Sequence, residues 1–279
     1  MLRRHVREHR AHSVVSRPLV SISRKTTDFG ELVRVPQATL RYFSNALQKH
    51  TQAEIILPDF SLDGPYHVMF LLHGLSDDQS IWMRRTSIER YVEGLPLIVV
   101  MPDGGRGWYT DAAEGYAYET AIAKELPEII AKTFPTKAPW CISGLSMGGY
   151  GAVKLALKHS ETFHSAVSHS GAMGMAHSIP DRDEAFKREF ARVFGPNPVG
   201  GDNDLHALVG KLRPSKMPLI RFDCGVDDFL IEFNRDFDRH LRELEVGHEY
   251  QEFPGDHNWA YWDEHVQEGI AFHRKNLHF

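Results

Sequence analysis

Short apolar runs alternate along the chain with longer segments in which apolar residues recur at helical spacing. The apolar runs predict strands at residues 38–42, 53–57, 67–72, 97–101, 140–143, 165–169, 219–223 and 249–253. The helical periodicity predicts helices at residues 81–92, 116–133, 148–158, 181–194, 202–211, 229–244 and 259–276. Because helices follow the strands from the third strand onward, we expect a mostly parallel central sheet with helices on both faces. The first two strands are expected to form an antiparallel edge.

A G-x-S-x-G pattern stands at residues 144–148, between an apolar run and a helix-forming run. In this strand–turn–helix context, a serine sits on a tight turn that exposes its hydroxyl above the sheet. The flanking glycines leave room for the strained backbone. We interpret Ser146 as a nucleophile rather than part of an ordinary Gly/Ser-rich turn, because suitable partners follow it downstream in the order found in α/β-hydrolases.

A serine nucleophile needs a histidine base, and the base needs an orienting carboxylate. The predicted strand at 219–223 ends in Asp223, and Asp227 and Asp228 follow it. His257 follows a Pro-Gly turn after the strand at 249–253. Ligands of parallel sheets bind at the carboxyl ends of the strands. His257 is therefore the candidate base among 17 histidines, while the residues alone leave the choice of acid open.

An oxyanion hole needs two backbone N–H groups. Met147, directly after the candidate nucleophile, provides the first. The buried apolar run at 68–72 stops at His73-Gly74, and the loop after it makes Leu75 the second candidate donor. His73 ends the strand, so we interpret it as structural.

Five motifs in order resemble the esterase D family. They are H-G-L-S at 73–76, P-D-G-x-x-x-W-Y at 102–109, G-L-S-M-G-G at 144–149, C-G-x-D-D-F-L at 224–230 and G-x-H-N-W-x-Y-W at 255–262. The family includes S-formylglutathione hydrolases, tributyrin-type, feruloyl and acetylxylan esterases, and mycobacterial mycolyltransferases. The resemblance extends from about Ala38 to the carboxyl end of the chain.

The resemblance implies an α/β-hydrolase fold, with the family's nucleophile on Ser146 and its histidine on His257. It places the acid on Asp228, with Asp227 as a close rival. It also implies that Trp108 and Tyr109 line the substrate site. The oxyanion loop lacks the cysteine and threonine usual in formylglutathione hydrolases, which moves the expectation toward simple carboxylic esters.

Composition and motif spacing argue against several kinds of partner and cofactor. A net charge of −5 gives no reason to expect a nucleic-acid partner, and no apolar run is long enough to cross a membrane. The two cysteines, Cys141 and Cys224, fall in buried strands that a third strand should separate, so we expect packing residues and no disulfide. We expect no metal, because the histidines around His257 lack ligand spacing, and no cofactor, because the glycine-rich loop at 104–107 lacks a Walker pattern.

Residues 1–30 form a candidate basic extension, in which Glu8 is the single acid of the first 25 residues. We expect a solvated extension or an arm against a neighbouring subunit, with a transit peptide and a polyanion contact as alternatives. Because the extension lacks the apolar core of a secretory signal, we expect a cytoplasmic location. The sequence is compatible with a homo-oligomer and does not determine the oligomeric state.

Residues 31–279 are expected to form a single α/β-hydrolase domain with a lid-like insertion around 172–216. This segment carries a Gly/Pro-rich stretch beyond what a crossover needs. The spacing of Phe186, Phe190 and Phe194 instead fits the core face of an ordinary crossover helix.

The sequence therefore predicts a serine carboxylesterase that hydrolyses short-chain or small aromatic esters, as small-molecule substrates, through an acyl-enzyme intermediate. An S-formylglutathione-type thioesterase and an acyltransferase are the alternatives. A catalytically silent binding protein is a further alternative of a different class.

Overall fold

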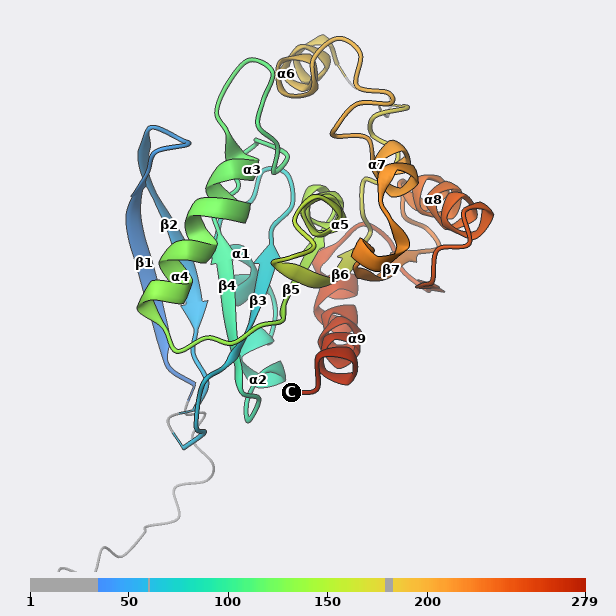
Figure 1. The fold of residues 1–279 in the computed structure, drawn as a ribbon. Helices are drawn as coiled ribbons and strands as arrows, with labels where there is room; N and C mark the ends of the chain where they lie inside the picture. Colours follow the sequence, from blue (N-terminus) through green and yellow to red (C-terminus); the bar gives the residue numbers. More distant parts are fainter. Residues whose placement is uncertain (1–34, 60, 179–182) are drawn as a thin grey trace, which may run out of the picture. The chain divides into compact units, whose positions relative to one another are not determined.

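A computed structural model describes residues 35–59, 61–178 and 183–279. The candidate basic extension at residues 1–30 lies outside the described residues. Within the described ranges, eight strands form one sheet in the order β1-β2-β4-β3-β5-β6-β7-β8 (Figure 1). The strands are β1 (Gln37–Ser44), β2 (Lys49–Ile56), β3 (His67–Leu72), β4 (Leu97–Pro102), β5 (Trp140–Leu145), β6 (Phe163–His169), β7 (Leu219–Gly225) and β8 (His248–Phe253).

Strands β1 and β2 form the antiparallel edge that the sequence predicted, and β2 also runs antiparallel to β4. All pairings from β4 through β8 are parallel, as expected. The β1–β2 hairpin is longer than predicted, because pairing continues to Ser44 and Lys49. The turn closes through Gln48, whose φ is +50°, and through the Leu47 N–H, which donates to Ser44 Oγ at 3.0 Å.

Helices cover both faces of the sheet. One apolar cluster joins the sheet to the segment from α3 (Tyr118–Thr120) through η1 (Ala121–Glu125) to α4 (Leu126–Thr133), and to α5 (Met147–Lys158) and α8 (Ile231–Glu243). The insertion helices α6 (Glu184–Phe194) and α7 (Leu205–Lys211) also contribute to it. The other cluster contains residues of α1 (Ile81–Arg85), α2 (Ile88–Tyr91) and α9 (Trp259–Leu277).

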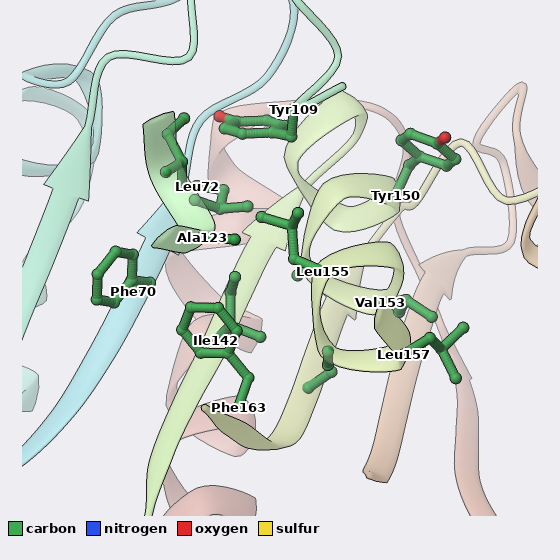
Figure 2. Packing of buried hydrophobic residues seen from close by; sticks show 14 of the residues in the cluster. Phe70, Leu72, Tyr109, Ala123, Ile142, Tyr150, Val153, Leu155, Leu157 and Phe163 are labelled. Atoms are coloured by element: carbon green, nitrogen blue, oxygen red, sulfur yellow. The ribbon is translucent and has the colours of Figure 1, made fainter. Parts of the chain in front are cut away.

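Alternation along the central strand β3 explains the two clusters. Phe70 and Leu72 belong to the first cluster, whereas Met69 and Leu71 belong to the second, as the period-two geometry of a strand requires. Figure 2 shows the first cluster, in which Phe70 meets Phe163 edge-on with ring centroids 5.3 Å apart. Every residue of β3 is buried, which is why the strand reads as one continuous apolar run.

Several sequence-based helix boundaries need correction. The helix predicted at 81–92 is two short helices, because Thr86 is extended and its hydroxyl donates to the Trp82 carbonyl at 2.6 Å. The helix predicted at 116–133 begins at Tyr118 and contains a π-helical turn, η1. The helix predicted at 181–194 is α6, described from Asp183, which caps Glu184–Phe194; residues 181 and 182 lie outside the described residues.

Cys141 on β5 and Cys224 on β7 are separated by β6, and both are free and buried, as expected. Among the described helices, none combines the length and the apolar character needed to cross a membrane.

Two glycines allow the start of α5 to pack closely against the ends of β5 and β3. A Cβ on Gly144 would lie 2.3 Å from the Gly148 carbonyl oxygen. A Cβ on Gly148 would lie 2.5 Å from the carbonyl oxygens of both Leu72 and His73. These contacts are with backbone, which cannot rotate away as a side chain can.

We therefore predict that Gly148→Ala lowers the free energy of unfolding by about 1–3 kcal/mol or more, because the added methyl group overpacks the turn. The matched control is Gly210→Ala in α7, where an added Cβ has no heavy atom within 4 Å. The control should raise stability by up to about 1 kcal/mol through helix propensity. Urea unfolding of both variants measures the difference, and equal stabilities would contradict the packing described here.

Candidate active site

Ser146 lies between the end of β5 and the start of α5, at the turn predicted for the candidate nucleophile. Its φ of +53° and ψ of −116° are unusual for a residue with a side chain. The turn is held by its own backbone: Ser146 N–H donates to the His169 carbonyl at 2.9 Å, and the Ser146 carbonyl accepts from Ala172 N–H at 3.2 Å. The strained geometry is therefore fixed from both sides by β6 and the loop that follows it.

The structure brings Ser146, His257 and Asp228 together in a chain of hydrogen bonds. His257 Nε2 lies 3.0 Å from Ser146 Oγ, and His257 Nδ1 lies 2.8 Å from Asp228 Oδ2. A carboxylate accepts hydrogen bonds, so Nδ1 carries the proton and the lone pair of Nε2 faces the serine hydroxyl. The His257 ring is held between Phe229, with centroids 4.5 Å apart, and Trp262, with centroids 4.9 Å apart.

The two aspartates near Asp228 in the sequence have different surroundings. Asp227 is exposed, whereas Asp228 is buried and also accepts from Leu230 N–H at 2.8 Å. Asp223 is fully buried, receives the Tyr261 hydroxyl at 3.0 Å and contacts His169 rather than His257. Of Asp223 within β7 and Asp227 and Asp228 after it, only Asp228 reaches His257 among the described contacts.

The loop after β3 is braced from several sides. His73 Nε2 accepts from Gly104 N–H at 2.9 Å, and His73 Nδ1 lies 2.7 Å from the Gly74 carbonyl. Burial lowers the pKa of His73, which favours the neutral ring that this pairing requires. His73 thus supports the loop as expected, and the loop carries Leu75 to the pocket beside Ser146.

A cavity of about 270 Å³ opens at Ser146 and His257. Its walls are mostly apolar and come from segments that are far apart in the sequence. The lining residues are Leu75, Ser76, Trp108, Ser146, Ala172, Met175, Phe186, Phe229, Leu230 and His257. Trp108 is thus at the pocket, where the resemblance placed it, and its ring packs edge-on against Phe190 and Phe194. Phe186 and Met175 come from the segment predicted as lid-like.

Tyr109 corrects the sequence-based expectation, because it is not among the residues that line this cavity. The side chain is fully buried, and its hydroxyl donates to the His73 carbonyl at 2.8 Å. Trp108 and Tyr109 both have positive φ values, +52° and +51°, and their rings have different surroundings. Tyr109 supports the loop after β3 and does not contact the pocket.

Arg106 is a residue at the site that sequence reasoning missed. It forms a bidentate ion pair with Glu189 of α6, and its Nη1 donates to Ser76 Oγ at 3.2 Å. It therefore links the loop after β4 both to the pocket-lining helix and to the loop after β3. The P-D-G-x-x-x-W-Y motif contained this arginine, but only the fold shows its partner 83 residues away.

The family model described as "Putative esterase" matches residues 44–273 of the chain. The chain belongs to the putative esterase family. An acetyl esterase of Caldicellulosiruptor saccharolyticus is 29% identical over 259 residues, covering 85% of this chain and 97% of that protein.

Two solved structures from Staphylococcus aureus show the same fold. FphF, a fluorophosphonate-binding serine hydrolase solved with substrate bound, is 29% identical with a TM-score of 0.77, over 85% of this chain and 98% of its own. An S-formylglutathione hydrolase is 30% identical with a TM-score of 0.73, and the match covers 85% of this chain and 98% of that protein. The expected α/β-hydrolase fold is therefore confirmed, and the chain is an esterase of the serine hydrolase class.

Proposed function

We propose that this esterase hydrolyses short-chain or small aromatic carboxylic esters through an acyl-enzyme formed on Ser146. The observation that carries the proposal is the hydrogen-bonded chain from Asp228 through His257 to Ser146, which ends at the mouth of an apolar cavity. The acetyl esterase relative and the family match support the same class of reaction.

In the proposed mechanism, Ser146 Oγ attacks the ester carbonyl while His257 Nε2 takes its proton. Asp228 holds the ring in the required tautomer and stabilises the imidazolium. The developing oxyanion is held by the N–H groups of Met147 and Leu75. Met147 is the first residue of α5, and the first N–H groups of a helix have no acceptor within the helix. His257 then protonates the leaving alcohol and activates water for deacylation.

The cavity supports a small acyl group. Its volume of about 270 Å³ falls just below the usual range of ligand pockets, roughly 300–1,000 Å³. Phe186 and Phe229 are aromatic walls that suit a methyl-terminated chain or a planar ring. We further propose that residues 31–279 form one domain. Within it, residues 172–216 act as a partial lid, because Ala172, Met175 and Phe186 line the cavity.

A thioesterase of the S-formylglutathione type is the second candidate, and the 30% identical hydrolase favours it. Glutathione is anionic, yet the residues that line the described cavity include no lysine or arginine. The nearby Arg106 is already paired with Glu189. An acyltransferase, in which an alcohol replaces water at the second step, is the third candidate.

We predict that Ser146→Ala lowers kcat at least about 10³-fold, because the acylated oxygen is removed. Asp228→Asn should lower kcat/KM roughly 10³- to 10⁴-fold by favouring the wrong histidine tautomer. Steady-state hydrolysis of p-nitrophenyl acetate measures both effects.

Asp227→Asn is the matched control, since Asp227 is the adjacent, exposed aspartate. It should leave kcat/KM within a small factor of the wild-type value. The opposite ranking of the two aspartate variants would assign the acid to Asp227.

We also predict that kcat/KM peaks at acetyl to butyryl esters and falls at octanoyl and beyond. Each methylene that fits contributes about 0.8 kcal/mol, and the cavity offers space for few of them. A panel of p-nitrophenyl esters, with a feruloyl ester and a formyl thioester beside them, measures the preference. Phe186→Ala should move the optimum to longer chains, whereas Phe43→Ala, on the exposed face of β1, should not. Wild-type rates that rise through decanoyl would contradict the pocket described here.

A further inference from the structure

A second cluster of ligand-type side chains lies in the segment between β6 and β7. His177 follows the pocket-lining residues Ala172 and Met175, Asp204 caps the N-terminus of α7, and His206 stands in the first turn of that helix. One donor atom from each of the three residues lies within 4.8 Å of the others. None of the three takes part in the Ser146–His257–Asp228 chain, so their arrangement needs a separate explanation.

The hydrogen bonding of His206 leaves one ring nitrogen facing the cluster. Its Nε2 lies 3.2 Å from Asp236 Oδ2, and a carboxylate accepts, so Nε2 carries the proton. Its Nδ1 is buried without a hydrogen-bond partner among the described residues and lies 3.8 Å from Asp204 Oδ1. Two lone-pair atoms therefore face each other with no hydrogen bond between them.

Asp204 gives the cluster a fixed negative charge. The residue is almost fully buried, and its Oδ2 accepts from Gly200 N–H at 2.8 Å. Its Oδ1 accepts from His206 N–H and lies 3.0 Å from His177 Nε2. The carboxylate is thus held in place by backbone donors, whereas His177 is 43% exposed and can adjust.

The donor set fits a zinc-class ion. Two imidazole nitrogens and one carboxylate oxygen are ligands that Zn²⁺ takes at about 2.0–2.2 Å, which in a tetrahedron separates neighbouring donor atoms by about 3.3 Å. The distances of 3.0 and 3.8 Å at Asp204 Oδ1 bracket this value. Asp236 behind His206 matches the carboxylate–histidine–metal arrangement that orients ligands in known sites. Mg²⁺ and Ca²⁺ prefer all-oxygen sets and fit less well.

We propose that His177, Asp204 and His206 form a binding site for Zn²⁺ or a similar divalent transition metal, with one position open to solvent. The ion ties the loop that carries Ala172 and Met175 to α7 and, through Asp236, to α8. It acts as a clamp on one wall of the cavity and takes no part in the reaction at Ser146. Local motif spacing does not indicate this site, because His177 and Asp204 are 27 residues apart in the chain.

The test uses the tag-free full chain, stripped with a chelator and titrated with Co²⁺ and then Zn²⁺. We expect one equivalent of Co²⁺ with the intense visible absorption of a four-coordinate nitrogen–oxygen site, displaced by Zn²⁺. His177→Ala should weaken binding at least tenfold without loss of folding, because the side chain is partly exposed. Zn²⁺ should raise Tm in the wild type and much less in this variant.

Two controls separate this site from other histidines. His164→Ala removes an exposed histidine of β6 and should leave metal binding unchanged. His257→Ala should also leave metal binding unchanged, which would show that the ion is not bound by His257 and Asp228. His206→Gln should weaken binding as His177→Ala does. The proposal is overturned if the wild type binds no equivalent of metal, if His177→Ala binds as tightly as the wild type, or if His257→Ala abolishes binding.

Discussion

The left-handed backbone of Ser146 is the constraint on which the rest of the site depends. A residue with a side chain in this conformation costs on the order of 1–3 kcal/mol, so the surrounding structure must hold it there. The support comes from β6 through the His169 carbonyl, from the loop after β6 through Ala172, and from the close approach of Gly148 to the end of β3. The same close approach brings the loop after β3, with Leu75, beside the serine. One backbone turn therefore positions both the hydroxyl and the candidate oxyanion donors.

The parallel sheet brings the other two groups to this turn. Strands β7 and β8 are neighbours, and their carboxyl ends carry Asp228 and His257. The two loops pack so closely that a Cβ on Gly225 would lie 2.3 Å from the Gly255 carbonyl oxygen. Phe229 and Trp262 then fix the orientation of the histidine ring. The hydrogen-bonded chain thus follows from strand order and loop packing. Ser146 follows β5, Asp228 follows β7 and His257 follows β8.

The sequence predicted the sheet and the positions of Ser146 and His257 because both rest on local patterns: a buried run, a tight turn and a helix start. It could not choose between Asp227 and Asp228 from the residues alone, because adjacent residues share one pattern and differ only in burial. It placed Tyr109 at the pocket, whereas the buried hydroxyl donates to the His73 carbonyl 36 residues away, a contact that no local pattern contains. The Arg106–Glu189 pair and the His177–Asp204–His206 cluster join distant segments, so no local pattern contains them.

Labelling with a fluorophosphonate tests the central claim most directly, because the probe phosphonylates an activated serine and spares an ordinary one. Intact mass spectrometry and peptide mapping should find one adduct per chain, on the peptide that contains Ser146. Labelling should become slow in His257→Ala and should disappear in Ser146→Ala. An adduct on another serine of the pocket, such as Ser76, or labelling that survives Ser146→Ala, would contradict the account.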